Sequence, residues 1–225
     1  MISKDTLRKC LYFDIETAGI TSSFEELLEF DPRIAKLWEK RCKWLKQNSG
    51  EEYRDYDCGD FWKIKASLHP EFSKVVCISF GAYHGEEMKI QSFIGEEYEI
   101  LNNTNKVFNN AISKAWKLGG HTIKNFDIPF VGKRMIINKI DPSPLIANLN
   151  RKPWESPYLD ISEAFSFGGW GQTHTSLDLM SAVLGLESPK EDMDGSMVHQ
   201  YFYEGRIDDI KKYCEMDVRV LMECF

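Results

Sequence analysis

The sequence lacks long apolar runs, paired cysteines and an excess of positive charge. No apolar stretch approaches the roughly 20 residues of a membrane-spanning helix, and residues 1–10 hold no signal-peptide core. The six cysteines form neither a C-x-x-C pair nor the Cys/His spacing of a zinc site, so we expect reduced core thiols instead of disulfides. These absences favour a soluble, cytoplasmic protein without a membrane anchor.

The balance of charge excludes a broad basic surface. The chain has 28 Lys and Arg against 35 Asp and Glu, a net charge of −7 at pH 7. A nucleic-acid partner would therefore have to be bound by a local basic patch or through metal ions. Internal repeats and low-complexity tracts are absent too, and 225 residues with 43% hydrophobic content fit one large domain. We expect a single domain over residues 1–225, with an insertion at about 24–70.

The order of apolar patterns along the chain is typical of an α/β protein. Runs rich in β-branched and aromatic residues predict strands over 9–15, 73–83, 87–95 and 119–123. Apolar residues at helical spacing predict helices over 98–118, 127–139, 176–186, 195–205 and 206–225. Proline and glycine predict loops over 141–160 and 167–174. The insertion is predicted to contain two helices broken at Pro32, followed by an acidic loop.

The first strand carries two carboxylates, in the stretch CLYFDIETAG. Side chains alternate along a strand, so Asp14 and Glu16 share one face while Ile15 points into the opposite layer. Like charges so close together repel, and a divalent cation with oxygen ligands would remove the conflict. The alternative is a strand end at the surface with both carboxylates solvated, and for a lone D-x-E that alternative is the favoured one.

A third carboxylate, Asp127, follows an apolar run at the start of a predicted helix. An Asp at that position often caps the helix, which is the alternative explanation. Asn125 and Phe126 stand directly before it, and an amide and an aromatic ring can orient a nucleotide. The fourth carboxylate, Asp217, shares a helix face with Tyr213 because the two are four residues apart. That face is apolar, so Asp217 needs a partner, either a cation or a buried bond such as one to Tyr213.

The ordered set of motifs resembles the DEDD superfamily of 3′–5′ exonucleases in its tyrosine subtype. The D-x-E pair, the N-F-D triplet over 125–127 and the Y-x-x-x-D pair follow the family's order, although Asn125 stands only two residues before Asp127. Lys212 occupies the place of the histidine of the other subtype. The stretches TSLDLMSAVLGL and DGSMVHQYFYEGRIDDIKKYCEMDV look like predicted exonucleases related to the proofreading domain of family B DNA polymerases. The resemblance runs from residue 9 to 223 and is thin across 24–68 and 141–158.

This resemblance implies a ribonuclease H-like fold, with a mixed central sheet flanked by helices, and hydrolysis of phosphodiester bonds with two divalent cations, Mg²⁺ or Mn²⁺. It makes Asp14 the bridging ligand. Glu16 and Asp217 would complete the site of the cation that activates water, and Asp127 would hold the second cation through a water. Tyr213 would orient the attacking water, since a free phenol with a pKa of about 10 is a poor general base.

The same resemblance suggests the substrate. Thr17 would contact the terminal nucleotide of single-stranded DNA, beside Asn125 and Phe126 as the other predicted substrate-binding residues, and nucleoside 5′-monophosphates would be released from the 3′ end. Two alternatives stay open: an exoribonuclease acting on RNA, and a catalytically weak nucleic-acid-binding or polymerase-docking module. The chain contains no polymerase region, so a proofreading or repair role would require a DNA polymerase or repair complex acting in trans.

Residues 33–46 form a local basic patch, with six cations and one acid. In a helix four of the cations would form a stripe that guides the phosphate backbone, and the opposite side of the helix would be apolar. The stripe is Arg33, Lys36, Lys40 and Lys43, and the apolar side is Ile34, Leu37, Trp38 and Leu45. The alternative is an ordinary solvated helix face.

Some further residues are given structural roles. We expect His121 and His174 to be structural or without a role, and Asp160 and Asp178 to cap helices. The glycine-rich stretch FGGWG is assigned no nucleotide role, because it lacks the strand-then-helix context of a phosphate loop.

Overall fold

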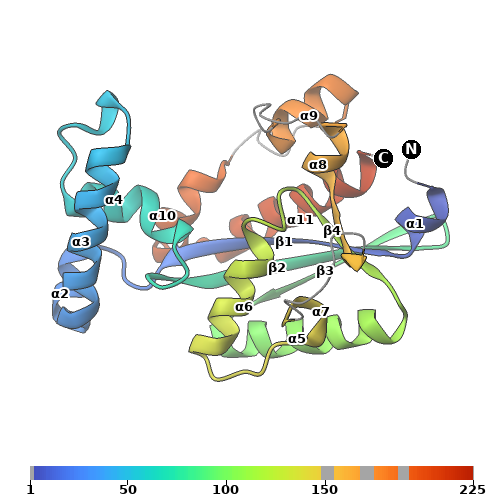
Figure 1. Ribbon diagram of the computed structural model, residues 1–225, viewed down its shortest axis with the longest axis horizontal. Helices are drawn as coiled ribbons and strands as arrows, with labels where there is room; N and C mark the ends of the chain where they lie inside the picture. Colours follow the sequence, from blue (N-terminus) through green and yellow to red (C-terminus); the bar gives the residue numbers. More distant parts are fainter. Residues whose placement is uncertain (1–2, 148–154, 168–174, 187–192, 225) are drawn as a thin grey trace.

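The computed structural model describes residues 3–147, 155–167, 175–186 and 193–224. Within these ranges one mixed sheet has the strand order β3-β2-β1-β4-β5 (Figure 1). β1 lies at its centre, antiparallel to β2 and parallel to β4. β2 and β3 form an antiparallel hairpin, and β4 and β5 are parallel. The strands are β1 Cys10–Gly19, β2 Ser73–His84, β3 Glu87–Ile94, β4 Lys117–Gly120 and β5 Tyr158–Asp160.

Helices cover both faces of this sheet, so the predicted α/β architecture with a mixed central sheet flanked by helices is confirmed (Figure 1). No described helix combines the length and the apolar character needed to cross a membrane. All six cysteines are free thiols, as predicted. The α-helices are α1 Lys4–Arg8, α2 Phe24–Phe30, α3 Pro32–Asn48, α4 Cys58–Lys65, α5 Glu97–Ser113, α6 Asp127–Ile137, α7 Pro144–Ala147, α8 Ile161–Phe165, α9 Leu177–Leu184, α10 Val198–Tyr203 and α11 Ile207–Glu223; short 3₁₀ turns are η1 Glu51–Tyr53, η2 Ala66–Leu68 and η4 Gly195–Met197.

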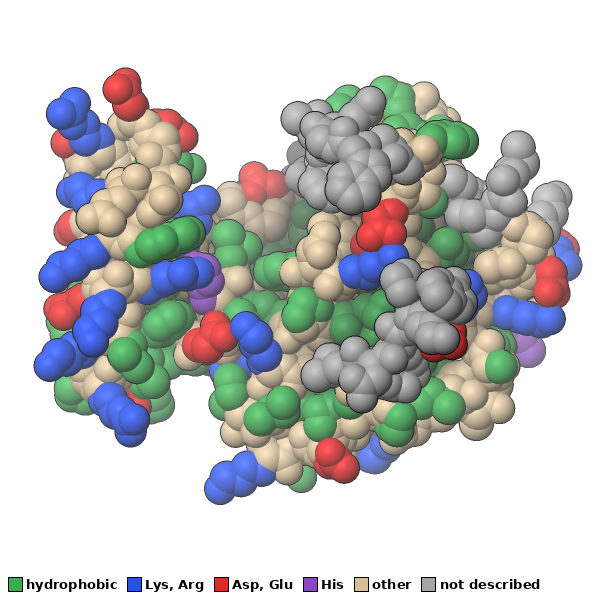
Figure 2. Space-filling view, viewed as in Figure 1, with side chains coloured by type: hydrophobic (Ala, Val, Ile, Leu, Met, Phe, Trp, Pro, Cys, Tyr) green, Lys and Arg blue, Asp and Glu red, His purple; other side chains and the backbone are tan. Residues whose placement is uncertain are grey.

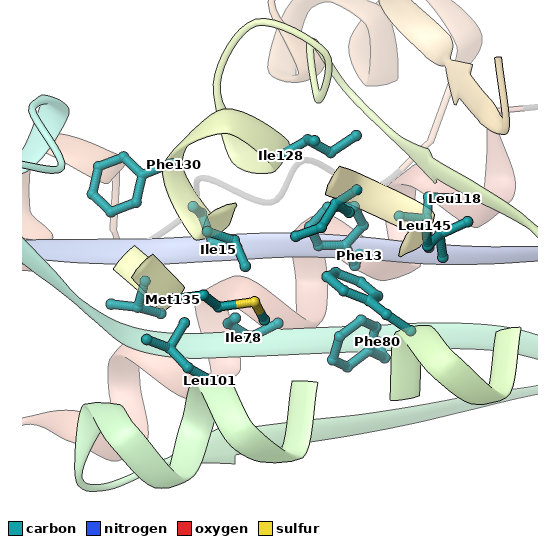
Figure 3. Close-up of a cluster of buried hydrophobic side chains, with 14 of the residues drawn as sticks. Phe13, Ile15, Ile78, Phe80, Leu101, Leu118, Ile128, Phe130, Met135 and Leu145 are labelled. Atoms are coloured by element: carbon teal, nitrogen blue, oxygen red, sulfur yellow. The ribbon is translucent and has the colours of Figure 1, made fainter. Parts of the chain in front are cut away.

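The main core lies between the sheet and the helices α5, α6 and α7 (Figure 3). Phe13 is fully buried there, with its ring centroid 5.9 Å from that of Phe80 and 5.6 Å from that of Phe108. Ile15 enters the same cluster. Each such side chain contributes about 1.5–3 kcal/mol through burial. Because strand side chains alternate, this anchoring turns Asp14 between them toward the other face.

Helix α11 covers that other face. Val218 and Leu221 pack against Cys10 and Tyr12 of β1 in a second buried cluster. α11 comes close to β2 at Gly81, where an added Cβ would lie only 2.6 Å from Cγ1 of Val218. The close packing of α11 on β1 and β2 fixes the distance between the strand and whatever polar groups the helix carries.

The connection between β1 and β2, residues 20–72, contains α2, α3, α4 and two 3₁₀ turns and lies beside the sheet (Figure 1, left). We call it the helical connection. It has its own core, in which the rings of Trp38 and Trp62 meet edge to face at 5.0 Å. The predicted break at Pro32 is confirmed, since Asp31 ends α2 and caps α3. The prediction of an acidic loop after these helices is wrong in part, because Asp57 and Asp60 form a capping box that starts α4.

Several boundaries differ from prediction. β1 continues to Gly19, past the predicted end at residue 15. The helix predicted over 98–118 ends at Ser113, because 117–119 pair with β1 as part of strand β4. The loop predicted over 141–160 contains α7 and β5 in its described part, since Pro157 precedes β5 and leaves its pairing intact. Of the loop predicted over 167–174, residues 168–174 lie outside the described residues.

Candidate active site

Asp14 and Glu16 lie inside β1 rather than at its end. Asp14 stands opposite Ser79 of β2 and Glu16 opposite Cys77, and the register shifts directly after Glu16. A shift of this kind re-aims side chains and is common beside active sites. Glu16 is only 7% exposed, which rules out the alternative of a solvated strand end.

Helix α11 brings Tyr213 and Asp217 to this strand. Both side chains are 8% exposed, on the same inward face as Ile210, Cys214 and Val218, as the helical spacing predicts. Arg219 on the outer face is exposed. Glu215 is partly exposed, and its carboxylate accepts a hydrogen bond of 2.6 Å from Ser92 of β3.

Asp127 is the first residue of α6 and is 4% exposed. The alternative of a helix cap does not hold, since Phe126 occupies the cap position without a side-chain bond. β4 pairs with β1 only as far as Tyr12, so the edge of β1 beyond it is open on that side. Asp127 approaches this open edge and accepts a hydrogen bond from the backbone of Ile15. Burial, the largest effect, raises the pKa of Asp127 to about 7, and repulsion from Asp160 and Asp217 adds to it.

The four carboxyl groups repel one another. Burial and then the charges of Asp217 and Asp127 raise the pKa of Asp14 well above its usual value. Burial and then the charges of Asp14 and Asp217 do the same for the pKa of Glu16. Protons or a cation must therefore offset the negative charge of this cluster in the folded protein.

Tyr213 stays protonated in this setting. Burial, repulsion from Asp217 and Glu16, and a hydrogen bond with Asp217 raise the pKa of its phenol above the ordinary value. The bond to Asp217, considered above as an alternative explanation for the buried carboxylate, is present. A protonated hydroxyl beside the acids can donate or accept a hydrogen bond, but it cannot act as a base near neutral pH.

Cys214 joins the cluster, although the sequence pattern marked it only as a core thiol. Its Sγ donates to the backbone oxygen of Asp14 at 3.4 Å and to Oδ2 at 3.6 Å. The ligand atoms of Asp14, Glu16 and Cys214 lie within 4.8 Å of one another. The available signal was its position one helical turn before Asp217, which places both on one face.

A family model for predicted 3′–5′ exonucleases related to the exonuclease domain of PolB matches residues 66–221, more than half of the chain. The chain belongs to this family. The matched range contains the N-F-D triplet, Tyr213 and Asp217, and confirms the resemblance drawn from the motifs. Among curated proteins none matches the chain in sequence. β1 and most of the helical connection lie outside the matched range. Asp14 and Glu16 are therefore assigned to the candidate site of this exonuclease-family protein by their position beside Asp127 and Asp217, and not by the family match.

The donor set fits a divalent cation. Carboxylate oxygens from β1, α6 and α11 are the hard ligands that Mg²⁺ and Mn²⁺ prefer. After burial, repulsion from the neighbouring carboxylates is the main cause of the raised pKa values of Asp14 and Glu16. A bound cation would favour their charged forms.

The predicted substrate-binding residues occupy different settings. The hydroxyl of Thr17 is buried and donates to the carbonyl of Ser67 at 2.7 Å, which ties β1 to the end of the helical connection. Asn125 is exposed and Phe126 is partly exposed, and both line a hollow between α6 and the helical connection. Contact of these three residues with substrate stays a prediction.

The residues set aside from the sequence are mostly structural. Asp160 caps α8, as predicted, and also accepts from the backbone of Thr122 at 3.0 Å. Asp178 does not cap α9, because the hydroxyl of Ser176 does so. Nε2 of His121 is 2.7 Å from the carbonyl oxygen of Thr175, a structural contact as expected. His174 and the FGGWG stretch after Phe167 lie outside the described residues.

Proposed function

We propose that the protein is a metal-dependent 3′–5′ exonuclease that releases nucleoside 5′-monophosphates from single-stranded DNA. The observation that carries this proposal is the convergence of Asp14, Glu16, Asp127 and Asp217, from three separate elements, in a chain that belongs to a family of predicted exonucleases. The relation of that family to the exonuclease domain of PolB favours DNA over RNA as the substrate.

In this proposal Asp14, Glu16 and Asp217 would hold one cation, and Asp14 and Asp127 would hold the second. Bound cations of this kind activate a water and offset the charge that develops on the scissile phosphate. The chain's own part is to aim the reactants. Tyr213, protonated and hydrogen-bonded to Asp217, orients the attacking water, and the packed β1 and α11 keep the carboxylates from moving apart.

The experiment that tests the proposal uses 3′-labelled and 5′-labelled oligonucleotides of DNA and RNA, incubated with Mg²⁺, Mn²⁺ or a chelator. We expect mononucleotide release from the 3′ end of single-stranded DNA and none with chelator. Asp14→Ala should abolish the activity while the protein stays folded, whereas Asp208→Ala, at an exposed acid on α11, should keep it. A folded Asp14→Ala protein with wild-type activity would contradict the assignment.

The same experiment separates the alternatives. Faster release from RNA would make the protein an exoribonuclease. Tight DNA binding without cleavage in any cation would favour the binding or polymerase-docking module. Calorimetric titration with Mn²⁺ adds an independent readout, because an active site of this composition should bind the cation without nucleic acid. A role beside a DNA polymerase or repair complex in trans is part of the proposal and needs a co-purification test of its own.

A further inference from the structure

A hollow of about 730 Å³ lies between the helical connection and α6 (Figure 2). We call it the groove. One wall is the face of α3 that carries Leu37, Lys40, Arg41 and Trp44, and the opposite wall includes Phe126 and Lys133. The segment that enters β2 forms part of its floor, with His69 among the lining residues.

The groove exposes apolar and aromatic side chains that do not belong to the core of the helical connection. Trp44 is 50% exposed and Leu37 43% exposed, whereas Trp38 on the same helix is fully buried. The expectation that Leu37 packs with Trp38 away from the basic residues is therefore wrong. The guanidinium of Arg41 lies 4.6 Å from the ring centroid of Trp44 and is held by a 3.3 Å contact with Nδ1 of His69. A fixed pair of aromatic ring and guanidinium suits a nucleobase followed by a phosphate.

The charge of this wall is opposite to that of the whole chain. Residues 33–46 carry six cations and one acid in a protein of net charge −7. The acid in the groove, Glu71, forms an ion pair of 2.8 Å with Lys133 across its floor, which leaves the positive side chains of α3 to set the local field. A polyanion with flat apolar groups complements this surface better than a peptide or a lipid tail does.

The groove also adjoins the carboxylate cluster at two points. Asn125 and Phe126 line it and directly precede Asp127. Leu68, another lining residue, directly follows Ser67. The carbonyl of Ser67 accepts a hydrogen bond from the hydroxyl of Thr17, the residue after Glu16. Lining residues of the groove thus lie next to Asp127 in sequence and next to the residue that accepts from Thr17.

We propose that the groove binds the single-stranded part of the substrate a few nucleotides before the 3′ end that is cut. Bases would stack on Trp44 and Phe126, and phosphates would contact Lys40 and Arg41. This inference rests on the proposed exonuclease function and adds to it a strand path built by α3, which lies outside the residues matched by the family model. It also replaces the basic stripe predicted from helical spacing, because only Lys40 of that stripe lines the groove.

The first test measures binding without catalysis. In an Asp14→Asn background with chelator, fluorescence anisotropy would follow a labelled single-stranded DNA of about ten nucleotides. The double variant K40E/R41E should weaken binding at least about tenfold and flatten its salt dependence by about 0.7 in log–log slope for each lost phosphate contact. The matched control K36E/K43E changes the same charge on exposed positions of α3 outside the groove lining and should lose much less. Equal losses in the two variants would overturn the proposal, since they would indicate a diffuse field.

The second test separates the groove from the chemistry. Trp44→Ala removes a half-exposed ring and should leave the melting temperature close to wild type. It should raise KM about tenfold for the longer oligonucleotide and leave a dinucleotide unaffected, while Trp44→Phe should restore most of the affinity. Unchanged binding and KM in Trp44→Ala would overturn the groove and leave the exonuclease intact. Weakened binding in Trp44→Ala, in a protein that cleaves nothing, would support the groove and refute the exonuclease.

Discussion

The thiol of Cys214 donates to Oδ2 of Asp14 at 3.6 Å, from one helical turn before Asp217. This contact lowers the pKa of Asp14, although burial and the neighbouring carboxylates raise it by more. A fully buried thiol thus favours the charged form of the carboxylate that we propose as the bridging ligand. In the proposed site Cys214 would therefore act as a positioning residue for Asp14.

Removing this donor should weaken cation binding. We expect Cys214→Ala to bind Mn²⁺ up to about tenfold more weakly near neutral pH, as loss of a partner to a metal ligand commonly does. Cys214→Ser keeps a donor and should stay closer to wild type. Calorimetric titration measures both, and the defect of the Ala variant should shrink as pH rises, because Asp14 then ionises without help. A defect of equal size in Ala and Ser, independent of pH, would indicate a packing role only.

Local rules account for what the sequence could predict about the site. The two-residue period of a strand places Asp14 and Glu16 together, and the helical period does the same for Tyr213 and Asp217. In the structure Glu16, Tyr213 and Asp217 are buried and Asp14 is partly buried. The order of the motifs was then enough to predict the family. The N-F-D triplet alone, however, could not show that Asp127 accepts a hydrogen bond from the backbone of Ile15 and does not cap its helix.

The parts that could not be predicted depend on contacts between distant segments. β5 is a three-residue strand that exists because β4 offers it an edge, and its own sequence has no strand signal long enough to recognise. Cys214 gained its role from a strand 200 residues earlier. The groove requires α3 and α6 to face each other, and helical spacing alone selected a different set of cations on α3.

The pH dependence of stability should reveal the carboxylate repulsion. The pKa of Asp127 is about 7 in the folded protein, against an ordinary value of 3.8. Between these values the folded state binds more protons than the unfolded state, so the free energy of unfolding falls as pH rises through this window. Without cation, Asp127→Asn should therefore be more stable than wild type near pH 7.5, on the order of 1–4 kcal/mol, and lose most of that advantage near pH 4.

Urea unfolding in chelator at both pH values measures this difference. Comparison with the variant is needed because the pKa values of His69 and His199 are lowered by burial, and these groups change stability with pH in the opposite direction. Adding Mn²⁺ should stabilise wild type more than Asp127→Asn. An advantage of Asp127→Asn that is the same at both pH values would contradict the electrostatic explanation.

Tyr213→Phe separates water orientation from proton transfer. We expect kcat to fall about 100-fold, because the attacking water loses its hydrogen-bond partner, while Mn²⁺ affinity changes little. The pKa of Tyr213 is raised above the ordinary value, so the phenol does not ionise in the working pH range. The alkaline limb of the pH–rate profile should therefore have the same midpoint in the variant. A limb that disappears in Tyr213→Phe would make the phenolate a base and refute the orienting role.

Arg134 and Glu97 hold α6 against α5 and β2. Arg134 donates to Glu97 at 2.8 Å and to the carbonyl of Pro70 at 2.9 Å, and Glu97 also accepts from the backbone of Val75. Arg134→Met leaves a carboxylate only 12% exposed without its main partner, so we expect a loss of about 3–5 kcal/mol in unfolding free energy. Lys89→Met, which breaks the exposed pair with Glu87, should cost about 0–1 kcal/mol. Similar losses for the two variants in urea unfolding would contradict the buried-pair argument.

Gly120 ends β4 where the strand meets the backbone of β1 next to the first carboxylate. An added Cβ would lie 2.9 Å from the carbonyl oxygen of Phe13 and closer still to Cγ2 of Ile123. Gly120→Ala should therefore cost about 1–3 kcal/mol and lower activity, because relieving the contact shifts the strand that bears Asp14.

Gly132→Ala is the matched control within α6, where the nearest atom to the new Cβ is 3.9 Å away. Alanine there should stabilise the protein by about 0.5–1 kcal/mol through helix propensity and leave activity unchanged. Thermal unfolding and nuclease assays on both variants decide the matter, and a Gly120→Ala protein with wild-type stability would show that β4 can move away from β1 freely.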